Sequence, residues 1–146
     1  MFRYIYSRIG VREIAEDIAQ ETFLRVWEHR KKFDSKKSSL KNWIFVIATN
    51  LLRDFFRKKR LETVELNDNL YHETGLDDMA QTDFVGFVFS RINKLSERDR
   101  ELLLLRYQAD LDINEIAEHM NLEYGAAKIA LHRATQKLKS LCNKDN

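Results

Sequence analysis

The chain has no proline, only four glycines and one cysteine among its 146 residues. Because proline and glycine most often end helices or form tight turns, their scarcity favours long uninterrupted helices over short strands. The single Cys142 excludes an internal disulfide and a zinc site built from several cysteines. It falls near the last turn of a helical pattern, where a structural thiol is the simplest interpretation.

The chain also has no signal-like start and no apolar run long enough to span a membrane. Its four histidines follow no metal-binding spacing, no glycine-rich phosphate loop is present, and no nucleophile stands beside a base in a known motif. We therefore expect a cytoplasmic protein that is not an enzyme, needs no metal or other cofactor, and does not insert into a membrane.

Charge is strongly segregated along the chain, although the formal net charge is only +2. Residues 53–60 hold five cations and one acid, whereas residues 61–90 hold seven acids and no lysine or arginine. The acidic stretch has few large apolar side chains and no regular period, which is typical of an extended or flexible linker. We expect this linker, residues 61–82, to join a helical domain of residues 1–60 to a second domain of residues 83–146.

The first domain begins with an apolar helical pattern that starts at residue 2 and ends at Gly10. So early a start indicates either a missing upstream part or an unusually short first helix. A second helix is expected over residues 11–29. Its core side would hold Ala15, Ile18, Ala19, Thr22, Phe23 and Val26.

The opposite side of this second helix is mixed in character and carries Asp17, Gln20, Glu21, Leu24 and Glu28. One interpretation is a solvated face with a single exposed leucine, which is common on protein surfaces. The other is a docking face, on which Leu24 is the apolar anchor and the acids select a basic partner. The helical pattern alone leaves both interpretations open.

A third helix is expected over residues 40–59, after a short polar turn in which Ser38 or Ser39 can cap it. Its buried side would hold Leu40, Ile44, Ile47, Ala48, Leu51 and Phe55. Its other side presents Val46, Asn50, Arg53 and Arg57, with Trp43 on the flank. An aromatic ring beside an amide and cations suits single-stranded DNA, whose bases stack and whose phosphates are neutralised. Equally, Trp43 fits the core, and the basic run fits a helix end favoured by the dipole.

The second domain carries the pattern of a helix-turn-helix. Ser96 and Asp112 are each placed to cap a helix, with Asp99 and Glu115 placed for the reciprocal bond. Asn121 suits the left-handed turn residue before the last helix. We therefore predict an all-α fold of two small helical domains on an acidic flexible linker, the second domain a helix-turn-helix without a wing.

The last helix, expected over residues 124–141, has one apolar and one polar face. Its inward face holds Ala127, Leu131, Ala134, Leu138 and Leu141. Its outward face holds Lys128, Ile129, His132, Arg133 and Gln136. Any small helical bundle would share the apolar pattern, but a lone isoleucine among cations suits contact with a thymine methyl group.

Three segments resemble a known family. AEDIAQETFLRVW and WIFVIATNLLRDFFRKKR resemble region 2 of the extracytoplasmic-function sigma factors of bacterial RNA polymerase, and INEIAEHMNLEYGAAKIALHRATQKL resembles region 4. The resemblance implies a sigma factor that binds core RNA polymerase, recognises minus-10 and minus-35 promoter elements and promotes DNA melting. The partners it implies are the beta-prime clamp and beta subunit of the polymerase, promoter DNA and an anti-sigma factor.

The resemblance also implies roles for single residues. Polymerase contact falls on Asp17, Gln20, Glu21 and Leu24. Minus-10 contact falls on Trp43, Asn50, Arg53 and Arg57, with residues 36–39 shaping base choice. Minus-35 contact falls on Lys128, Ile129, His132 and Arg133. The chain departs from the family where Thr49 replaces a usual basic residue and where Ile129 and Ala130 replace a common Ser-Arg pair, so the target promoter does not follow from relatives.

Two other classes of function would each explain part of the sequence. A helix-turn-helix regulator that acts without docking on polymerase would explain residues 83–146 but not the first sixty residues. A helical interaction protein that does not bind DNA would explain the cores and the mixed helix face. It leaves the two basic surfaces unexplained.

Overall fold

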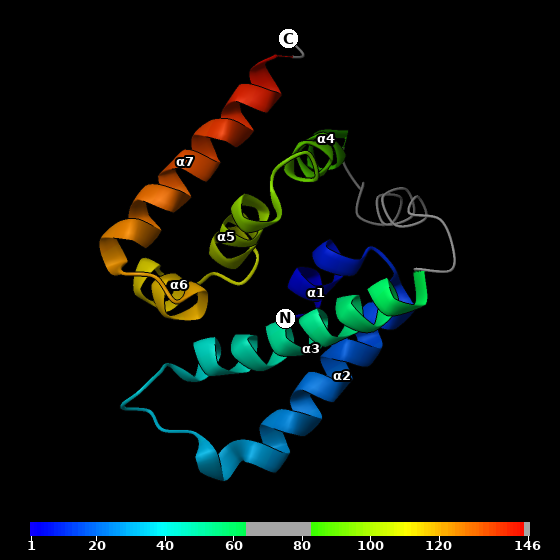
Figure 1. Cartoon of the computed structure of the whole chain (residues 1–146), viewed down its shortest axis with the longest axis vertical. Coiled ribbons are helices and arrows are strands. Elements are labelled where there is room, and N and C mark those ends of the chain that lie inside the picture. The colour runs from blue at the N-terminus through cyan, green and yellow to red at the C-terminus, as the bar shows by residue number, and fades with distance from the viewer. Residues whose placement is uncertain (64–82, 145–146) are drawn as a thin grey trace. The chain divides into compact units, whose positions relative to one another are not determined.

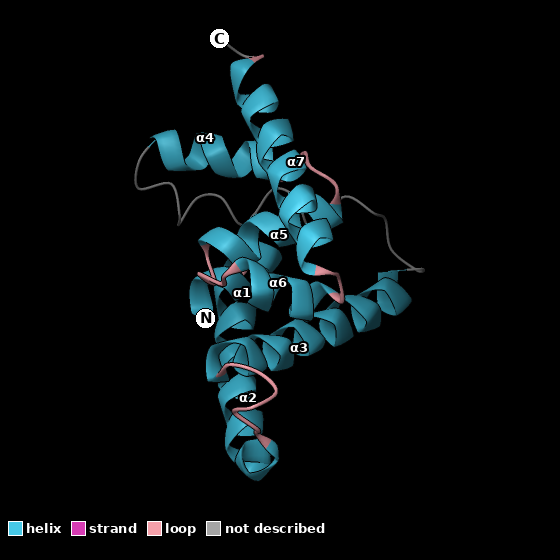
Figure 2. Cartoon of the chain, turned by 90° about the vertical axis from the view of Figure 1, so that its left-hand side faces the viewer, coloured by secondary structure: helices cyan, strands magenta, loops and turns pink. Residues whose placement is uncertain are grey.

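A computed structural model describes residues 1–63 and 83–144 (Figure 1). Throughout these ranges the regular secondary structure is helical, which confirms the predicted all-α class (Figure 2). The predicted acidic linker, residues 61–82, lies outside the described residues from residue 64 onward, and its first three residues continue a helix. The chain divides into two compact units, Met1–Gly75 and Leu76–Asn146.

The helices agree closely with the sequence patterns. The first unit contains α1 (Phe2–Ile9), α2 (Arg12–His29), a short 3₁₀ turn (Arg30–Lys32) and α3 (Leu40–Thr63). The second unit contains α4 (Asp83–Ile92), α5 (Glu97–Tyr107), α6 (Ile113–Met120) and α7 (Tyr124–Asn143). The third and last helices run four and two residues beyond their expected ends at residues 59 and 141.

In the first unit, α1 packs against α2 and α3. It ends at Gly10, whose φ of 76° is the left-handed conformation that glycine adopts readily. Tyr4 is fully buried, its ring meets Phe45 edge-on at 5.3 Å, and its hydroxyl lies 3.3 Å from the Thr49 hydroxyl. Thr49 is itself buried and donates to the Phe45 carbonyl. Thr49 therefore belongs to the core contact between α1 and α3.

For two residues of the first unit the prediction of a core position is wrong. Phe23 is 54% exposed and Leu40 is 52% exposed. The buried positions of α2 are Ala15, Ile18 and Thr22, and Phe23 lies outside them. Leu40 is the first residue of α3, where the helix begins. Two residues that the pattern did not place in the core, Phe45 and Leu52, are buried instead.

In the second unit, α5 and α6 pack against α7. The leucines at positions 102–105 are all buried, and Ala127 and Ala134 of α7 are fully buried opposite them. Asp112 and Glu115 form the predicted reciprocal cap of α6, and Asn121 ends that helix with a left-handed φ of 53°. These local features end α6 and lead the chain into the turn before α7.

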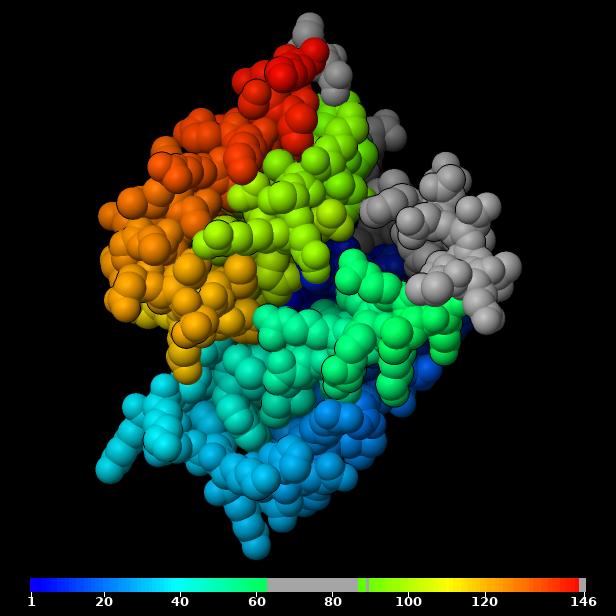
Figure 3. All heavy atoms as spheres, viewed as in Figure 1, coloured from blue at the N-terminus to red at the C-terminus, as the bar shows by residue number. Residues whose placement is uncertain are grey.

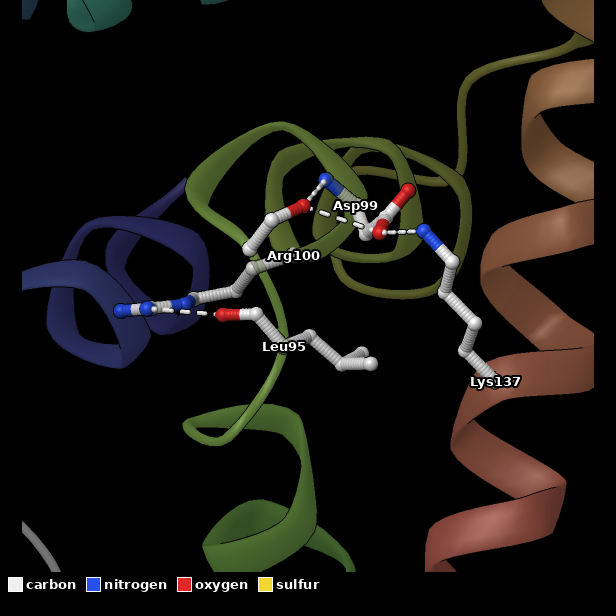
Figure 4. Close-up of polar contacts among 5 residues, drawn as sticks. Leu95, Asp99, Arg100 and Lys137 are labelled. Carbon is white, nitrogen blue, oxygen red and sulfur yellow. Dashed lines mark hydrogen bonds and ion pairs between the residues drawn. The ribbon is translucent and has the colours of Figure 1, made fainter.

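The cap of α5 reaches across to α7 (Figure 4). The Ser96 hydroxyl accepts from the Asp99 amide, as predicted. The Asp99 carboxylate then accepts from the Ser96 hydroxyl at 2.9 Å and from the Lys137 ammonium at 2.6 Å. Asp99 therefore joins the helix cap to α7, 38 residues further along the chain.

The Asp99 link makes the stability of the second unit depend on pH. The hydrogen bond from Lys137 lowers the pKa of Asp99 below 3.8, although burial opposes it. A carboxyl group whose pKa is lower in the folded state stabilises the fold above its ordinary pKa and loses that effect as pH falls through the folded value. We expect Asp99→Asn to cost about 1 kcal/mol at pH 7 and progressively less below pH 4.

Thermal unfolding of the full chain between pH 7 and pH 2.5 would measure this effect. Asp17→Asn, an exposed aspartate of α2, is the matched control and should leave the unfolding temperature almost unchanged. A loss for Asp99→Asn that is equal at both ends of the pH range would show that the Asp99 charge does not stabilise the fold.

Candidate functional site

The outer face of α2 carries more apolar surface than the sequence pattern indicated. Leu24 is 59% exposed, and Phe23 and Trp27 beside it are 54% and 66% exposed. We call these three residues the α2 apolar stripe. The guanidinium of Arg30 lies 4.0 Å from the centre of the Trp27 ring and donates to the Trp27 carbonyl at 2.7 Å, which holds the indole against the end of the helix.

Acidic and amide groups border this stripe. Asp17 and Gln20 are exposed, whereas Glu21 is half-buried and paired with Arg25 at 2.9 Å. Three large apolar side chains within five residues form a cluster rather than a single stray leucine, and such clusters are typical of interaction surfaces. The cluster favours the docking interpretation of α2. Phe23 was missed because it lies at the edge of the apolar side of the wheel.

The outer face of α3 carries the predicted aromatic, amide and basic groups. Asn50, Arg53 and Arg57 are exposed, and Trp43 is half-buried. The Asn50 amide oxygen accepts a long 3.4 Å hydrogen bond from Arg53. Arg57 pairs with Asp54 at 3.0 Å on the exposed surface. Both contacts are at the surface and leave these groups close to solvent.

Trp43 belongs neither to the deep core nor to open solvent. Its ring lies 5.3 Å from that of Phe33, the apolar residue of the turn between α2 and α3. Through this contact Phe33 packs back onto its unit. One side of the indole is therefore supported by Phe33 at the base of the turn, at the start of the exposed α3 face.

The turn before α3 is tied to the helix by a residue that the sequence analysis missed. Asn42 is fully buried, its backbone amide donates to the Ser39 hydroxyl at 3.1 Å, and its side chain donates to the Ser38 hydroxyl at 3.2 Å. Ser39 is thus the predicted cap of α3. In Figure 1 the turn projects from the end of α2 before the chain enters α3. An asparagine in the first turn of the helix, three residues after Ser39, was the only sequence signal for this role.

The outer face of α7 agrees with its prediction. Lys128, His132 and Arg133 are exposed, and Ile129 is 54% exposed. Figure 3 shows side chains of α7, coloured orange to red, uncovered along the helix. Tyr124, which begins the helix and is 49% exposed, was not singled out from the sequence. Lysine, histidine, arginine and isoleucine on the second helix of a helix-turn-helix form a surface suited to the DNA major groove.

The described residues give no support to two other kinds of site. No group of three or more histidine, cysteine, aspartate or glutamate side chains among them could hold a metal ion. None of the helices within residues 1–63 and 83–144 is long and apolar enough to cross a membrane.

Comparison with family models gives the class of protein. Residues 1–62 match the model of sigma-70 region 2, and residues 89–138 match the model of sigma-70 region 4. The first match contains the exposed faces of α2 and α3, and the second contains the helix-turn-helix and most of α7. The two matches together define an initiation factor of the sigma-70 type, a class that is in general non-enzymatic.

Curated relatives identify the subfamily. The chain is 30% identical to the ECF RNA polymerase sigma factor SigM of Bacillus subtilis, over 99% of this chain and 89% of that protein. It is also 30% identical to SigW of the same organism, over 95% and 81%, and 32% identical to EcfG of Rhodopseudomonas palustris, over 94% and 76%. The chain therefore belongs to the extracytoplasmic-function sigma factors, which bind core RNA polymerase and promoter DNA and direct transcription initiation.

Solved structures show the same fold. The sigma factor RpoE of Bartonella quintana, solved with the anti-sigma factor NepR, matches with a TM-score of 0.75 at 22% identity, over 99% of this chain and 91% of that chain. CnrH, solved with the cytosolic domain of CnrY, matches with a TM-score of 0.70 at 24% identity, over 99% and 81%. The helical architecture is thus shared with sigma factors of low sequence identity.

Proposed function

We propose that three exposed helix faces divide the work of initiation among them. The face of α2 binds core polymerase, the face of α3 with its preceding turn opens the minus-10 element, and the face of α7 reads the minus-35 element. This proposal rests on the contrast between the outer faces of α2 and α3 within the first unit. Two helices packed on each other present outer faces of different chemistry, one apolar and acidic, the other aromatic, amide-bearing and basic.

The polymerase contact is proposed for Asp17, Gln20, Glu21 and Leu24, on the beta-prime clamp, with a further contact on the beta subunit. Leu24 would supply the apolar anchor, and its neighbours Phe23 and Trp27 would enlarge the buried area. The exposed Asp17 carboxylate would favour a basic partner and raise the rate of encounter. Such an arrangement of apolar anchor and polar border is typical of protein interfaces.

The minus-10 contact is proposed for Trp43, Asn50, Arg53 and Arg57, with residues 36–39 shaping base choice. A base that leaves the duplex can stack on an aromatic ring, which is worth roughly 1–3 kcal/mol per base. The Phe33 contact holds the Trp43 ring in place for this task. Asn50 can donate to and accept from a base edge, and the two arginines can neutralise phosphates, so the separated strand would be stabilised relative to the duplex.

The minus-35 contact is proposed for Lys128, Ile129, His132 and Arg133. The cations would contact phosphates, and Ile129 would contact a thymine methyl group in the major groove.

We further propose domains of residues 1–60 and 83–146 joined by the acidic linker of residues 61–82. Two modest DNA contacts on one tethered chain then reinforce each other, because the first raises the effective concentration of the second.

The chain would act by binding and strand separation, without a covalent step or cofactor, and in the cytoplasm with the polymerase. We also propose an anti-sigma factor among its partners, because a sigma factor of similar fold has been solved with one. The α2 apolar stripe would give that inhibitor an anchor whenever polymerase does not cover it.

In vitro transcription tests the proposed function. Core RNA polymerase, with and without the chain, would be given a genomic DNA pool, and the start sites would be sequenced. We expect discrete start sites that depend on the chain and share two spaced sequence elements. Specific DNA binding by the chain alone, with no start sites when core polymerase is added, would favour the alternative regulator that does not act through polymerase.

A further inference from the structure

Gly125 is a helical glycine that the fold of the free chain does not require. It lies in the first turn of α7, and among the described glycines only Gly10 has a positive φ. A Cβ atom built at Gly125 would meet nothing within 4 Å. Because glycine is the poorest helix former after proline, alanine would fit this position and favour the helix more. Neither backbone conformation nor packing around Gly125 therefore accounts for a glycine here.

The position of Gly125 on α7 indicates which partner the backbone at this glycine would face. Ile129 and His132 follow at spacings of four and seven residues, which keeps all three on one side of the helix. All three are exposed, and Lys128 and Arg133 lie exposed on either side of this line. Gly125 thus stands at the amino-terminal end of the surface proposed to read DNA.

The diameter of a helix and the width of the DNA major groove leave little room between the two at this position. A helix with its side chains is about 10–12 Å across, and the major groove is about 12 Å wide. In a helix-turn-helix the amino-terminal residues of the second helix contact the base edges. The absence of a Cβ atom allows the helix backbone to approach by roughly one bond length, about 1.5 Å.

We infer that Gly125 is the point at which the α7 backbone approaches the base edges of the minus-35 element most closely, so that a side chain there would hold the helix away from the groove. This inference rests on the proposed function of α7. It makes Gly125 a positioning residue for promoter recognition, which acts through the contacts of Ile129 and His132.

The test uses the full chain assembled with core polymerase on a promoter duplex identified by the transcription assay. We expect Gly125→Ala to unfold at the same temperature as the natural chain or a higher one. Promoter affinity should nevertheless fall roughly tenfold, the effect of losing one good base contact. Gly125→Val, with a larger side chain, should bind more weakly still.

Two control variants make the outcomes distinguishable. Ser140→Ala adds no bulk near the first turn and should keep full affinity, because Ser140 is exposed on α7 fifteen residues further on. Lys128→Ala reports whether α7 binds DNA at all, and it should weaken binding and reduce its salt dependence.

Full affinity of Gly125→Ala beside weakened Lys128→Ala would overturn the inference and leave α7 as the reading helix. Full affinity of both variants would remove the proposed DNA role of α7 and the inference with it. A lower unfolding temperature for Gly125→Ala would also overturn the inference, because the fold itself would then need the glycine.

Discussion

Leu24→Asp should abolish binding to core RNA polymerase while the chain folds normally. A leucine that becomes buried at an interface contributes about 1.5–3 kcal/mol, and an unpaired carboxylate buried in its place costs several more. A loss of about 4 kcal/mol weakens binding roughly a thousandfold. The fold should be unaffected, because Leu24 is 59% exposed in the free chain and surface substitutions change stability little.

Affinity capture of core polymerase by the tagged chain would measure this loss, with circular dichroism as the check on folding. Leu61→Asp is a matched control, because Leu61 is 72% exposed near the end of α3 and belongs to a different helix from Leu24. It should retain polymerase binding. If Leu24→Asp captured polymerase as well as the natural chain does, the proposed docking face on α2 would be wrong.

Asn50→Ala should impair promoter opening by roughly 10- to 100-fold while polymerase binding stays intact. A lost hydrogen bond to a base edge, with the unpaired base group left behind, costs about 1–3 kcal/mol. Among the described residues the Asn50 side chain makes only a long surface contact with Arg53, so its removal should not disturb α3. Permanganate reactivity of unpaired thymines would report opening directly.

A promoter with its minus-10 region already unpaired distinguishes two roles for Asn50. If Asn50 helps to separate the strands, such a template should restore activity to Asn50→Ala. If Asn50 reads a separated base, the defect should persist. Asn143→Ala, an exposed asparagine at the end of α7, is the control and should open promoters normally. An equal loss of polymerase binding and opening would instead make Asn50 a structural residue.

Local sequence determined much of this protein, because helices are specified by contacts between residues close in the chain. The reciprocal cap of Asp112 and Glu115, the left-handed Asn121 and the helix end at Gly10 all occur where the pattern predicts them. The two faces of α7 were likewise predictable, since its buried alanines and exposed cations alternate with the helical period. The roles assigned to the exposed residues remain predictions.

Tertiary structure decided which side chains at the edges of those faces are covered. A helical wheel gives the direction of each residue but not the width of the stripe that neighbouring helices cover. That width depends on partners far away in the sequence. It left Phe23 and Trp27 exposed beside Leu24, and it buried Asn42 beneath the turn before α3. The contact of Tyr4 with Thr49 and that of Asp99 with Lys137 join residues 45 and 38 positions apart, which no local pattern could have paired.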